Sequence, residues 1–358
     1  MSRLTRAQTQ ERTRVAVLAA ARDEFAEHGF RDAKIDRIAE RAELTRGAVY
    51  SNFPGKRSLY FAVLADQAER ETPGSRRRPA RDVGQALGAF ARAWLARLPL
   101  ATEGGDAAWL GKDLLPEITA DERVRRPFAE LMALEAILLG LALERVQGPG
   151  SVRLVPVAEM ALTILSGASQ LAATAPGFVE PFHVVQVCER LADLDLDSRW
   201  RPPHLPHVAK ARPVDAPWPA GTATDALRGD AVPLADDGVI AVLGLHRLSA
   251  VEEAVRAAPA DVEVTAVLVT GTEQELGPLV RLVLAELRGG LRHAIPDRAW
   301  PRLRLVYDGS GALAAAAGVS AVSDATEAAV RIRGGRIVAG ADGRGACHAA
   351  ASTALGEG

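Results

Sequence analysis

Cysteine is scarce in this chain of 358 residues, which contains only Cys188 and Cys347. Two cysteines so far apart in sequence exclude a disulfide framework and a cysteine-rich zinc site. The sequence therefore predicts neither a bound metal nor a disulfide-stabilised secreted domain, and we expect a cytoplasmic protein.

Long apolar runs and phosphate-binding glycine motifs are missing as well. No stretch of about 18 consecutive apolar residues occurs, so the sequence predicts no membrane contact. The opening segment MSRLTRAQTQERTR lacks the apolar core of a signal peptide. Neither G-x-x-x-x-G-K-[ST] nor a strand-linked G-x-G-x-x-G occurs, and we therefore expect no nucleotide cofactor.

The net charge of −2 argues against indiscriminate binding to nucleic acid, but the charges are unevenly distributed. Residues 1–58 contain 12 Lys/Arg and 8 Asp/Glu, which gives +4. The remaining 300 residues contain 31 and 37, which gives −6. A basic end on an acidic body can orient a protein on DNA.

The stretch from Lys34 to Lys56 predicts two short helices joined by a tight turn. Apolar residues recur at helical spacing over residues 35–42. Thr45 is a good N-cap for the second helix, and Pro54-Gly55 ends it. Two helices arranged in this way form a helix-turn-helix, whose second helix enters the major groove of DNA. The alternative is a plain buried helical hairpin.

Four pieces of sequence make the helix-turn-helix interpretation specific: Phe25-Ala26-Glu27-His28-Gly29-Phe30, Ile38-Ala39, the run from Ala42 to Tyr50, and Phe53-Pro54-Gly55-Lys56. With their spacing, residues 11–64 resemble the DNA-binding domain of the TetR family of transcriptional regulators. Two positions depart from the family pattern. Glu43 stands where the family often has Gly, in a turn that favours positive φ, and Lys34 stands where it often has Thr or Ser.

The resemblance implies a palindromic DNA operator and a DNA-facing set of residues: Lys34, Thr45, Arg46, Gly47, Tyr50, Asn52 and Lys56. Arg46 is the expected base contact, because a guanidinium can donate two hydrogen bonds to one guanine. Lys34 and Lys56 are expected to contact phosphates, and Tyr50 to fix register through the backbone.

Residues 59–197 predict a helical body. Helices are expected near residues 82–97, 107–115, 125–147, 154–174 and 181–195, and such a series is typical of an antiparallel bundle. In TetR-like proteins this body holds the effector cavity and the dimer interface. The sequence therefore predicts a DNA-binding domain at 1–58 and an effector-binding and dimerisation domain at 59–197, complete without the rest of the chain.

Bulky side chains are few in the body, because aromatic residues make up only 4% of the chain. The candidates for the effector pocket are Phe90, Trp94, Trp109, Phe128 and Met132, although each is equally suited to a helical core. No dense polar cluster accompanies them, so we expect a largely apolar small molecule. The last two helices have broad apolar faces, with small residues at Gly167, Ala168 and Ser169 that allow a partner helix to approach. A homodimer through these faces is expected; the alternative is that they serve only the monomer core.

Residues 198–237 contain seven prolines and predict a linker or an extended segment that wraps the protein. Residues 238–358 then alternate strands and helices, in the order β-α-β-α-β-α-β-β-α. This order, with the phrases Asp308-Gly309-Ser310-Gly311 and Arg331-Ile332-Arg333-Gly334-Gly335, resembles the thioredoxin-like fold of peroxiredoxin-type chains. The predicted fold class is therefore multi-domain, with an all-α head and body followed by an α/β domain.

The catalytic thiol of that fold is missing. Redox chemistry needs a thiolate at the end of the first strand, where this chain has His246-Arg247-Leu248-Ser249. Cys347 lies in the closing helix, and the segment Ser323-Asp324-Ala325-Thr326 lacks the proline that usually precedes the next strand. The resemblance therefore implies a catalytically inactive domain, and we expect no enzyme.

The sequence thus favours a homodimeric, ligand-responsive repressor that a small molecule releases from its operator. Two alternatives stay open: a thiol-redox sensor or enzyme fused to a DNA-binding domain, and an adaptor that binds another protein through its C-terminal domain.

Overall fold

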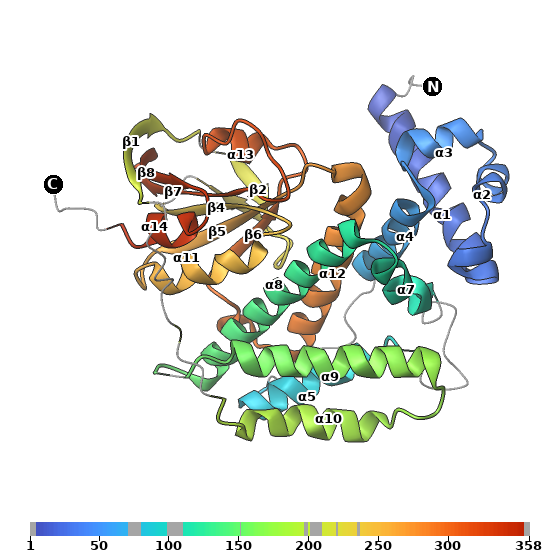
Figure 1. The fold of residues 1–358 in the computed structure, drawn as a ribbon, viewed down its shortest axis with the longest axis horizontal. Coiled ribbons are helices and arrows are strands. Elements are labelled where there is room, and N and C mark those ends of the chain that lie inside the picture. Colours follow the sequence, from blue (N-terminus) through green and yellow to red (C-terminus); the bar gives the residue numbers. More distant parts are fainter. Residues whose placement is uncertain are drawn as a thin grey trace.

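The computed structural model describes residues 5–70, 80–98, 110–150, 152–196, 200, 210–219, 221–234 and 237–353. Three parts of the chain are arranged in space as Figure 1 shows: a helical head at the N-terminus, helices that form the body, and a C-terminal α/β domain.

The head contains α1 (Arg6–Asp32), α2 (Ile35–Arg41) and α3 (Arg46–Asn52). Thr5 caps α1 with a reciprocal pair of bonds to Gln8. The helix is interrupted at Gly29, whose φ of 69° is open to glycine but rare for other residues. The sequence predicts the same two short helices, and this prediction is confirmed.

Helix α4 (Lys56–Arg70) leaves the head, and the remaining helices of the body follow it. They are α5 (Val83–Leu95), η1 (Gly111–Asp113), α7 (Leu114–Thr119), α8 (Glu122–Gln147), α9 (Val155–Thr174), α10 (Pro181–Arg190) and η2 (Leu191–Asp193). Helices α5, α9 and α10 pack together away from the head (Figure 1).

The α/β domain is built on a mixed six-stranded sheet in the order β1-β8-β7-β4-β5-β6. Its strands are β1 (Arg212–Pro217), β4 (Gly238–Gly244), β5 (Glu263–Val269), β6 (Leu303–Tyr307), β7 (Glu327–Arg333) and β8 (Arg336–Asp342). Strands β4, β5 and β6 are parallel, whereas β7 and β8 form an antiparallel hairpin that pairs with β4. Both faces of β4 are buried, as expected of a strand in the centre of such a sheet.

Helices cover the sheet on both faces. They are η3 (Leu248–Ala250), α11 (Val251–Ala257), α12 (Glu273–Ala294), η4 (Asp297–Ala299), α13 (Ala312–Ala316) and α14 (Ala346–Ala351). One core contains α11, α12 and α14, and the core on the other face contains α13 and Trp218. The predicted order of strands and helices from residue 238 is confirmed.

The proline-rich segment is part of this domain. The prediction of a linker over residues 198–237 is wrong for its described second half, and the alternative of a wrapping segment is right. Strand β1 pairs with β8, and a small hairpin forms from β2 (Thr222–Thr224) and β3 (Ala231–Pro233). The indole of Trp218 is buried and donates to the carbonyl of Leu234 at 2.6 Å. Proline is tolerated in β1 because this strand lies at the edge of the sheet.

One hydrophobic core joins all three parts. It runs from the head through α4, α5 and α8 into α12 and the inner face of the sheet. The expectation that head and body are complete by residue 197 stays a prediction, although α12 packs into the core that the head and body share.

Candidate DNA-binding site

The second helix of the helix-turn-helix is held by a cap and by two buried side chains. The Thr45 hydroxyl accepts a hydrogen bond from the backbone N–H of Ala48 at 3.2 Å, which caps α3. Val49 and Phe53 are buried in the head. The guanidinium carbon of Arg14 lies 4.9 Å from the centre of the Phe53 ring. With this face buried, the opposite face of α3 carries Arg46, Gly47 and Tyr50 to the surface.

Arg46 has two neighbours on this surface. Its Nη1 lies 3.3 Å from Oδ1 of Asp36 on α2, and its guanidinium carbon lies 5.5 Å from the centre of the Tyr50 ring. Tyr50 and then the carboxylate of Asp36 raise the pKa of Arg46. Both groups of the Arg46–Asp36 pair are well exposed, so water screens their attraction and the pair can open.

Gly47 and Asn52 differ in how freely each could contact a molecule on the surface of α3. A Cβ added to Gly47 would meet only the Thr45 hydroxyl, at 3.8 Å, so the fold does not need glycine there. Asn52 is tied to its own helix, because its amide donates to the carbonyl of Ala48 at 2.9 Å. The structure therefore leaves space over Gly47, whereas the Asn52 amide group already has a partner.

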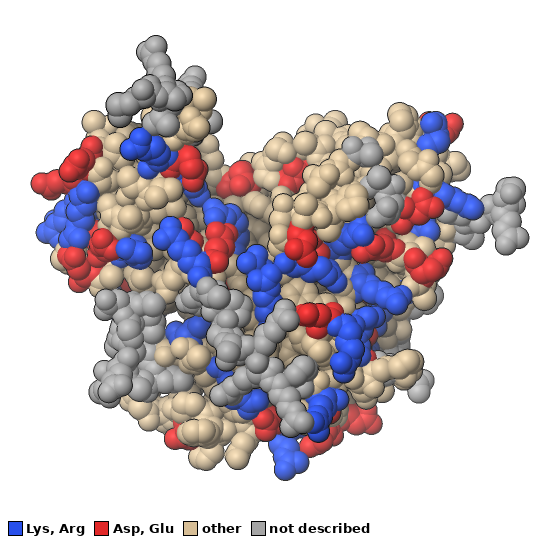
Figure 2. Space-filling model, turned by 180° about the vertical axis from the view of Figure 1, so that it is seen from behind, with Lys and Arg blue, Asp and Glu red and all other residues tan. Residues whose placement is uncertain are grey.

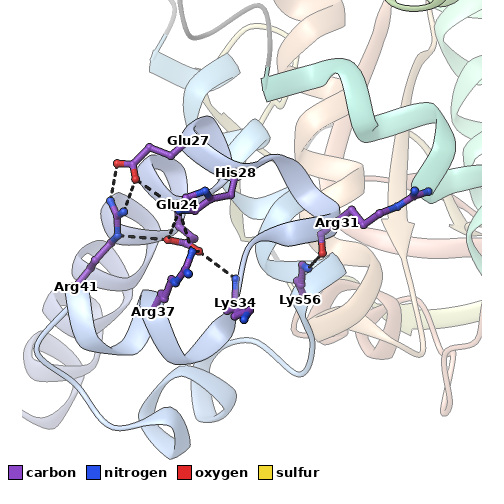
Figure 3. A network of polar contacts seen from close by, with 8 residues as sticks. All are labelled: Glu24, Glu27, His28, Arg31, Lys34, Arg37, Arg41 and Lys56. Atoms are coloured by element: carbon purple, nitrogen blue, oxygen red, sulfur yellow. Dashed lines mark hydrogen bonds and ion pairs between the residues drawn. The ribbon is translucent and has the colours of Figure 1, made fainter.

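A buried carboxylate fixes α1 against the start of α2 (Figure 3). Glu24 is fully buried and accepts the backbone N–H of Lys34 at 3.1 Å. Arg41 approaches its other oxygen at 3.4 Å, and Arg37 lies 3.8 Å away. Burying a charge is costly unless it is paired, so these contacts strongly favour one placement of α2.

Lys34 and Lys56, the two expected phosphate contacts, differ in availability. The Lys34 side chain is exposed at the start of α2. Lys56 donates from Nζ to the carbonyl of Arg31 at 2.9 Å, and Nζ lies 4.8 Å from the centre of the Phe30 ring. Burial lowers the pKa of Lys56. Lys56 therefore holds the end of α1 in this structure, in addition to any contact with DNA.

The turn between the two helices has the predicted strain. Glu43 has φ of 55°, the only positive value at a non-glycine residue within the described parts of the chain. The backbone N–H of Leu44 closes the turn by donating to Ala39 at 2.9 Å.

Bulk charge does not distinguish the head on the face that Figure 2 shows, where Lys and Arg side chains lie among Asp and Glu side chains over both the head and the α/β domain. On this face, charge alone therefore gives no reason to single out the head.

Comparison with known proteins identifies this arrangement. Residues 17–63 match the family model described as bacterial regulatory proteins, tetR family. These residues form a TetR-type helix-turn-helix domain. The match covers α2, α3 and the glycine break in α1.

Two curated relatives from Pseudomonas putida match the chain over 67 residues at 45% identity. One is the HTH-type transcriptional regulator SrpR, with 19% of this chain and 31% of the relative covered. The other is the uncharacterised HTH-type transcriptional regulator TtgW, with 19% and 49% covered. The chain thus matches less than half of the length of either relative. A solved TetR-family regulator from Pectobacterium atrosepticum aligns at 20% identity over 53% of this chain and 94% of its own, with a TM-score of 0.36.

The TetR-type domain is joined to the body by polar contacts from η1, α7 and α8. Asp113 accepts the backbone N–H of Phe30 at 2.8 Å, just after the break at Gly29. Arg57 donates to Glu117 at 3.2 Å and to Asp121 at 2.7 Å. The Tyr60 hydroxyl donates to the carbonyl of Leu110. The segment 110–121 therefore contacts the end of α1 and the first turns of α4.

The structure places the residues expected in an effector pocket in different surroundings. Phe90 is buried, and Trp94 donates to the Ser169 hydroxyl at 2.8 Å. Phe128 and Met132 lie half-buried on α8, and Trp109 lies outside the described residues. A hollow of about 1490 Å³ opens between the start of α5, the end of α8, the start of α9, and α10 with η2. Its lining includes Arg81, Leu154, His183 and Arg190.

An ion pair lies just after β4, at the place where the sequence resemblance would put a redox thiolate. Arg247, just after β4, donates to the buried carboxylate of Glu327 at 2.8 Å. Cys347 is fully buried, and burial raises its pKa well above the ordinary value. Burial likewise raises the pKa of Cys188 to about 11. Neither thiol forms a nucleophilic thiolate readily near neutral pH.

Three residues of the head and its link escaped prediction from sequence. Glu24 stands beside exposed charged residues of α1, and its burial was not predicted. Asp36 acquires its partner only when α3 lies beside α2, and Asp113 only when η1 lies against the end of α1. A carboxylate at a position that the helical periodicity places inward would have been the available signal for Glu24.

Proposed function

We propose that this protein is a sequence-specific, DNA-binding transcriptional repressor. The observation that carries the proposal is the exposed first turn of α3, capped by Thr45 and presenting Arg46 over a TetR-type scaffold. Arg46 reads a guanine, Lys34 contacts a phosphate, and Tyr50 fixes the register. Gly47 lets the DNA backbone approach. Asn52 and Lys56 contribute secondary contacts, because each has a partner within the head.

The active form is a homodimer whose two heads reach successive major grooves of a palindromic operator. Support comes from an unpartnered apolar face on the last two helices of the body. Its large exposed side chains are Met160, Leu171, Phe178, Phe182 and Val187. An added Cβ at Gly167 would meet nothing within 4 Å, so a partner helix has room to approach there.

The proposed dimer face also accounts for the apolar composition of α9. Within the described residues, α9 is the one helix that is long and apolar enough to pass as a membrane span by length and composition. Of its most apolar 18-residue stretch, 44% is buried inside the protein. Its apolar residues divide between the core and the exposed face, an arrangement that suits a helix packed on both sides in a dimer.

A small, largely apolar effector releases the repressor by binding the body. Phe128 and Met132 are the favoured contacts, because they are half-buried and not fully enclosed as Phe90 is. Segment 110–121 is the route to the head, through Asp113 and Arg57. Native mass spectrometry of the purified protein would test this by retaining a bound small molecule.

The α/β domain is thioredoxin-like and catalytically inactive. The parallel pair β4–β5 beside the antiparallel hairpin β7–β8 supports the fold, and the Arg247–Glu327 pair at the end of β4 supports the loss of redox chemistry. The buried thiols of Cys188 and Cys347 argue against a thiol-redox sensor. An adaptor role for the domain stays as the second candidate.

Selection from a pool of randomised duplexes tests the function. The purified full chain should enrich a palindromic sequence whose half-sites are about one helical turn, or a multiple, apart. Recovery of no sequence above the starting pool, at low salt and with protein that is folded, would contradict a sequence-specific regulator.

A further inference from the structure

Helix α4, which links the head to the body, is enclosed by the protein on every side. Eight consecutive residues, 58 to 65, are buried along two turns of the helix. A helix with one face in water would alternate buried and exposed residues with its period of 3.6. The head covers α4 through α1, and η1 and α7 approach its first turns.

The remaining side of α4 is covered by α12, which belongs to the α/β domain. The contact between α12 and α4 is the most extensive between any two of the described helices. Figure 1 shows α12 between the sheet and the head. Helix α12 also packs on α5 and α8, and its buried residues belong to the core that includes the inner face of the sheet.

A two-point ion pair fixes the register of the two helices. Nε of Arg281 donates to Oε1 of Glu69 at 3.0 Å, and Nη2 donates to Oε2 at 2.6 Å. This fork geometry holds orientation as well as distance. Arg14 of α1 is close enough for the charge of Arg281 to help lower its pKa, second to the effect of burial. The charge of Arg281 therefore acts on α1 as well as on α4.

The far half of α12 is held just as closely. A Cβ added to Gly290 would lie 2.5 Å from the ring of Phe90, so the α5 ring lies directly on the α12 backbone. Two further pairs tie α11 to the body: Arg153 with Glu252 at 2.6 Å, and Arg256 with Glu144 at 2.6 Å. The α/β domain is therefore attached to the body through both α11 and α12.

We propose that the α/β domain regulates DNA binding by setting the position of α4 through α12. A change in the position of this domain moves the Arg281–Glu69 pair and, with it, the link to the head. The inference rests on the proposed DNA binding and adds a regulatory function for a domain that has no catalytic thiol. Coupling between a site and a remote binding surface typically amounts to about 5- to 150-fold in affinity.

Charge reversal across the pair tests the coupling. The probe is the duplex that the wild-type chain selects from a randomised pool. Arg281→Glu places two carboxylates opposite each other and should change the affinity for this duplex by about fivefold or more. Adding Glu69→Arg restores an ion pair with reversed polarity and should return the affinity to within about twofold of wild type. The slope of affinity against salt should be unchanged, because the side chains that meet phosphates are the same in all three proteins.

Arg336→Glu is the matched control. It makes the same charge change in the same domain, at the Arg336–Asp215 pair on β8 and β1, far in the fold from α4. It should leave the affinity as in wild type. If Arg281→Glu does not fold, Arg281→Gln replaces it and should change the affinity in the same direction, to a smaller extent.

Equal affinities for wild type, control and folded Arg281 variants would overturn the inference while leaving the proposed function intact. A changed affinity that Glu69→Arg fails to restore would overturn it as well. If the wild-type chain selects no duplex, the proposed function itself fails, so the two failures are distinguishable.

Discussion

Nη1 of Arg46 lies 3.3 Å from Oδ1 of Asp36, so the side chain that we propose reads a base is paired with a carboxylate on the preceding helix. The pair joins the start of α2 to the start of α3, and both groups are exposed. Before Arg46 can donate to a guanine, it must leave Asp36. The pair also places a negative charge on the surface that we propose meets DNA.

Asp36→Asn should therefore raise DNA affinity. The substitution keeps the shape of the side chain, removes a charge that repels phosphate, and frees Arg46. Because charge repulsion does not depend on sequence, we expect tighter binding to both the selected duplex and a scrambled one, on the order of severalfold at low salt. Glu40→Gln, on the same helix, is the charge-matched control. Weaker binding by Asp36→Asn would show that Asp36 orients Arg46 productively.

Gly47→Leu should separate DNA binding from stability. The site has room for a Cβ and is helical, so replacing glycine should leave the free energy of unfolding unchanged or raise it by about 0.5–1 kcal/mol. The added side chain occupies the space over α3 and should abolish specific binding. Thermal melting and DNA titration of one preparation measure both effects. Retained operator binding would show that DNA does not approach Gly47.

Gly167→Arg should give monomers. The substitution meets no atom of its own chain within 4 Å of the new Cβ, so the fold should persist. On the face with Met160 and Leu171, an arginine at this point would prevent close approach of a partner helix. Sedimentation velocity should show a monomer with a lower operator affinity. A stable dimer of Gly167→Arg would place the interface elsewhere.

Glu135 should make stability depend on pH. It is buried on α8, which packs against α12, and its pKa is raised from 4.5 to about 8 by burial and then by the negative charge of Glu286, against the opposing effect of Arg97. The folded protein keeps a proton that the unfolded chain loses. The stabilisation is therefore complete below pH 4.5 and is lost as pH rises from 4.5 to about 8.

Glu135→Gln should remove this loss, which is at most about 1.4 kcal/mol per pH unit. Urea unfolding of wild type and variant between pH 5 and 9 measures the difference, with the exposed Glu275→Gln as control. We expect the variant to gain stability relative to wild type as pH rises towards 8. Parallel curves for wild type and Glu135→Gln would contradict the buried, protonated carboxyl.

Much of the fold follows from the sequence because its signals are local. Caps, breaks and periodicity identify the head, and Thr45 caps α3 as predicted. The alternation of apolar strands and helices gives the order of elements from residue 238. The core residues Val49 and Phe53 follow from the spacing of the short helices.

The parts that escaped prediction depend on contacts between distant segments. Strand β1 was hidden by its prolines, since an edge strand needs hydrogen bonds on only one side. The buried face of α12 looks like that of any helix covering a sheet, and its sequence does not indicate that its second partner is α4. Glu69 and Arg281 are 212 residues apart, and local pattern cannot pair them.

The measurement that most directly tests the account is a titration of wild type, Arg46→Ala and Lys34→Ala on the selected and scrambled duplexes at several salt concentrations. Arg46→Ala should lose on the order of tenfold on the selected duplex, relax preference at one base pair per half-site, and change little on the scrambled one. Lys34→Ala should weaken both duplexes alike and reduce the salt slope by about one for each lysine–phosphate pair removed. Equal binding of wild type to both duplexes, or equal loss by Arg46→Ala on both, would contradict base reading by α3.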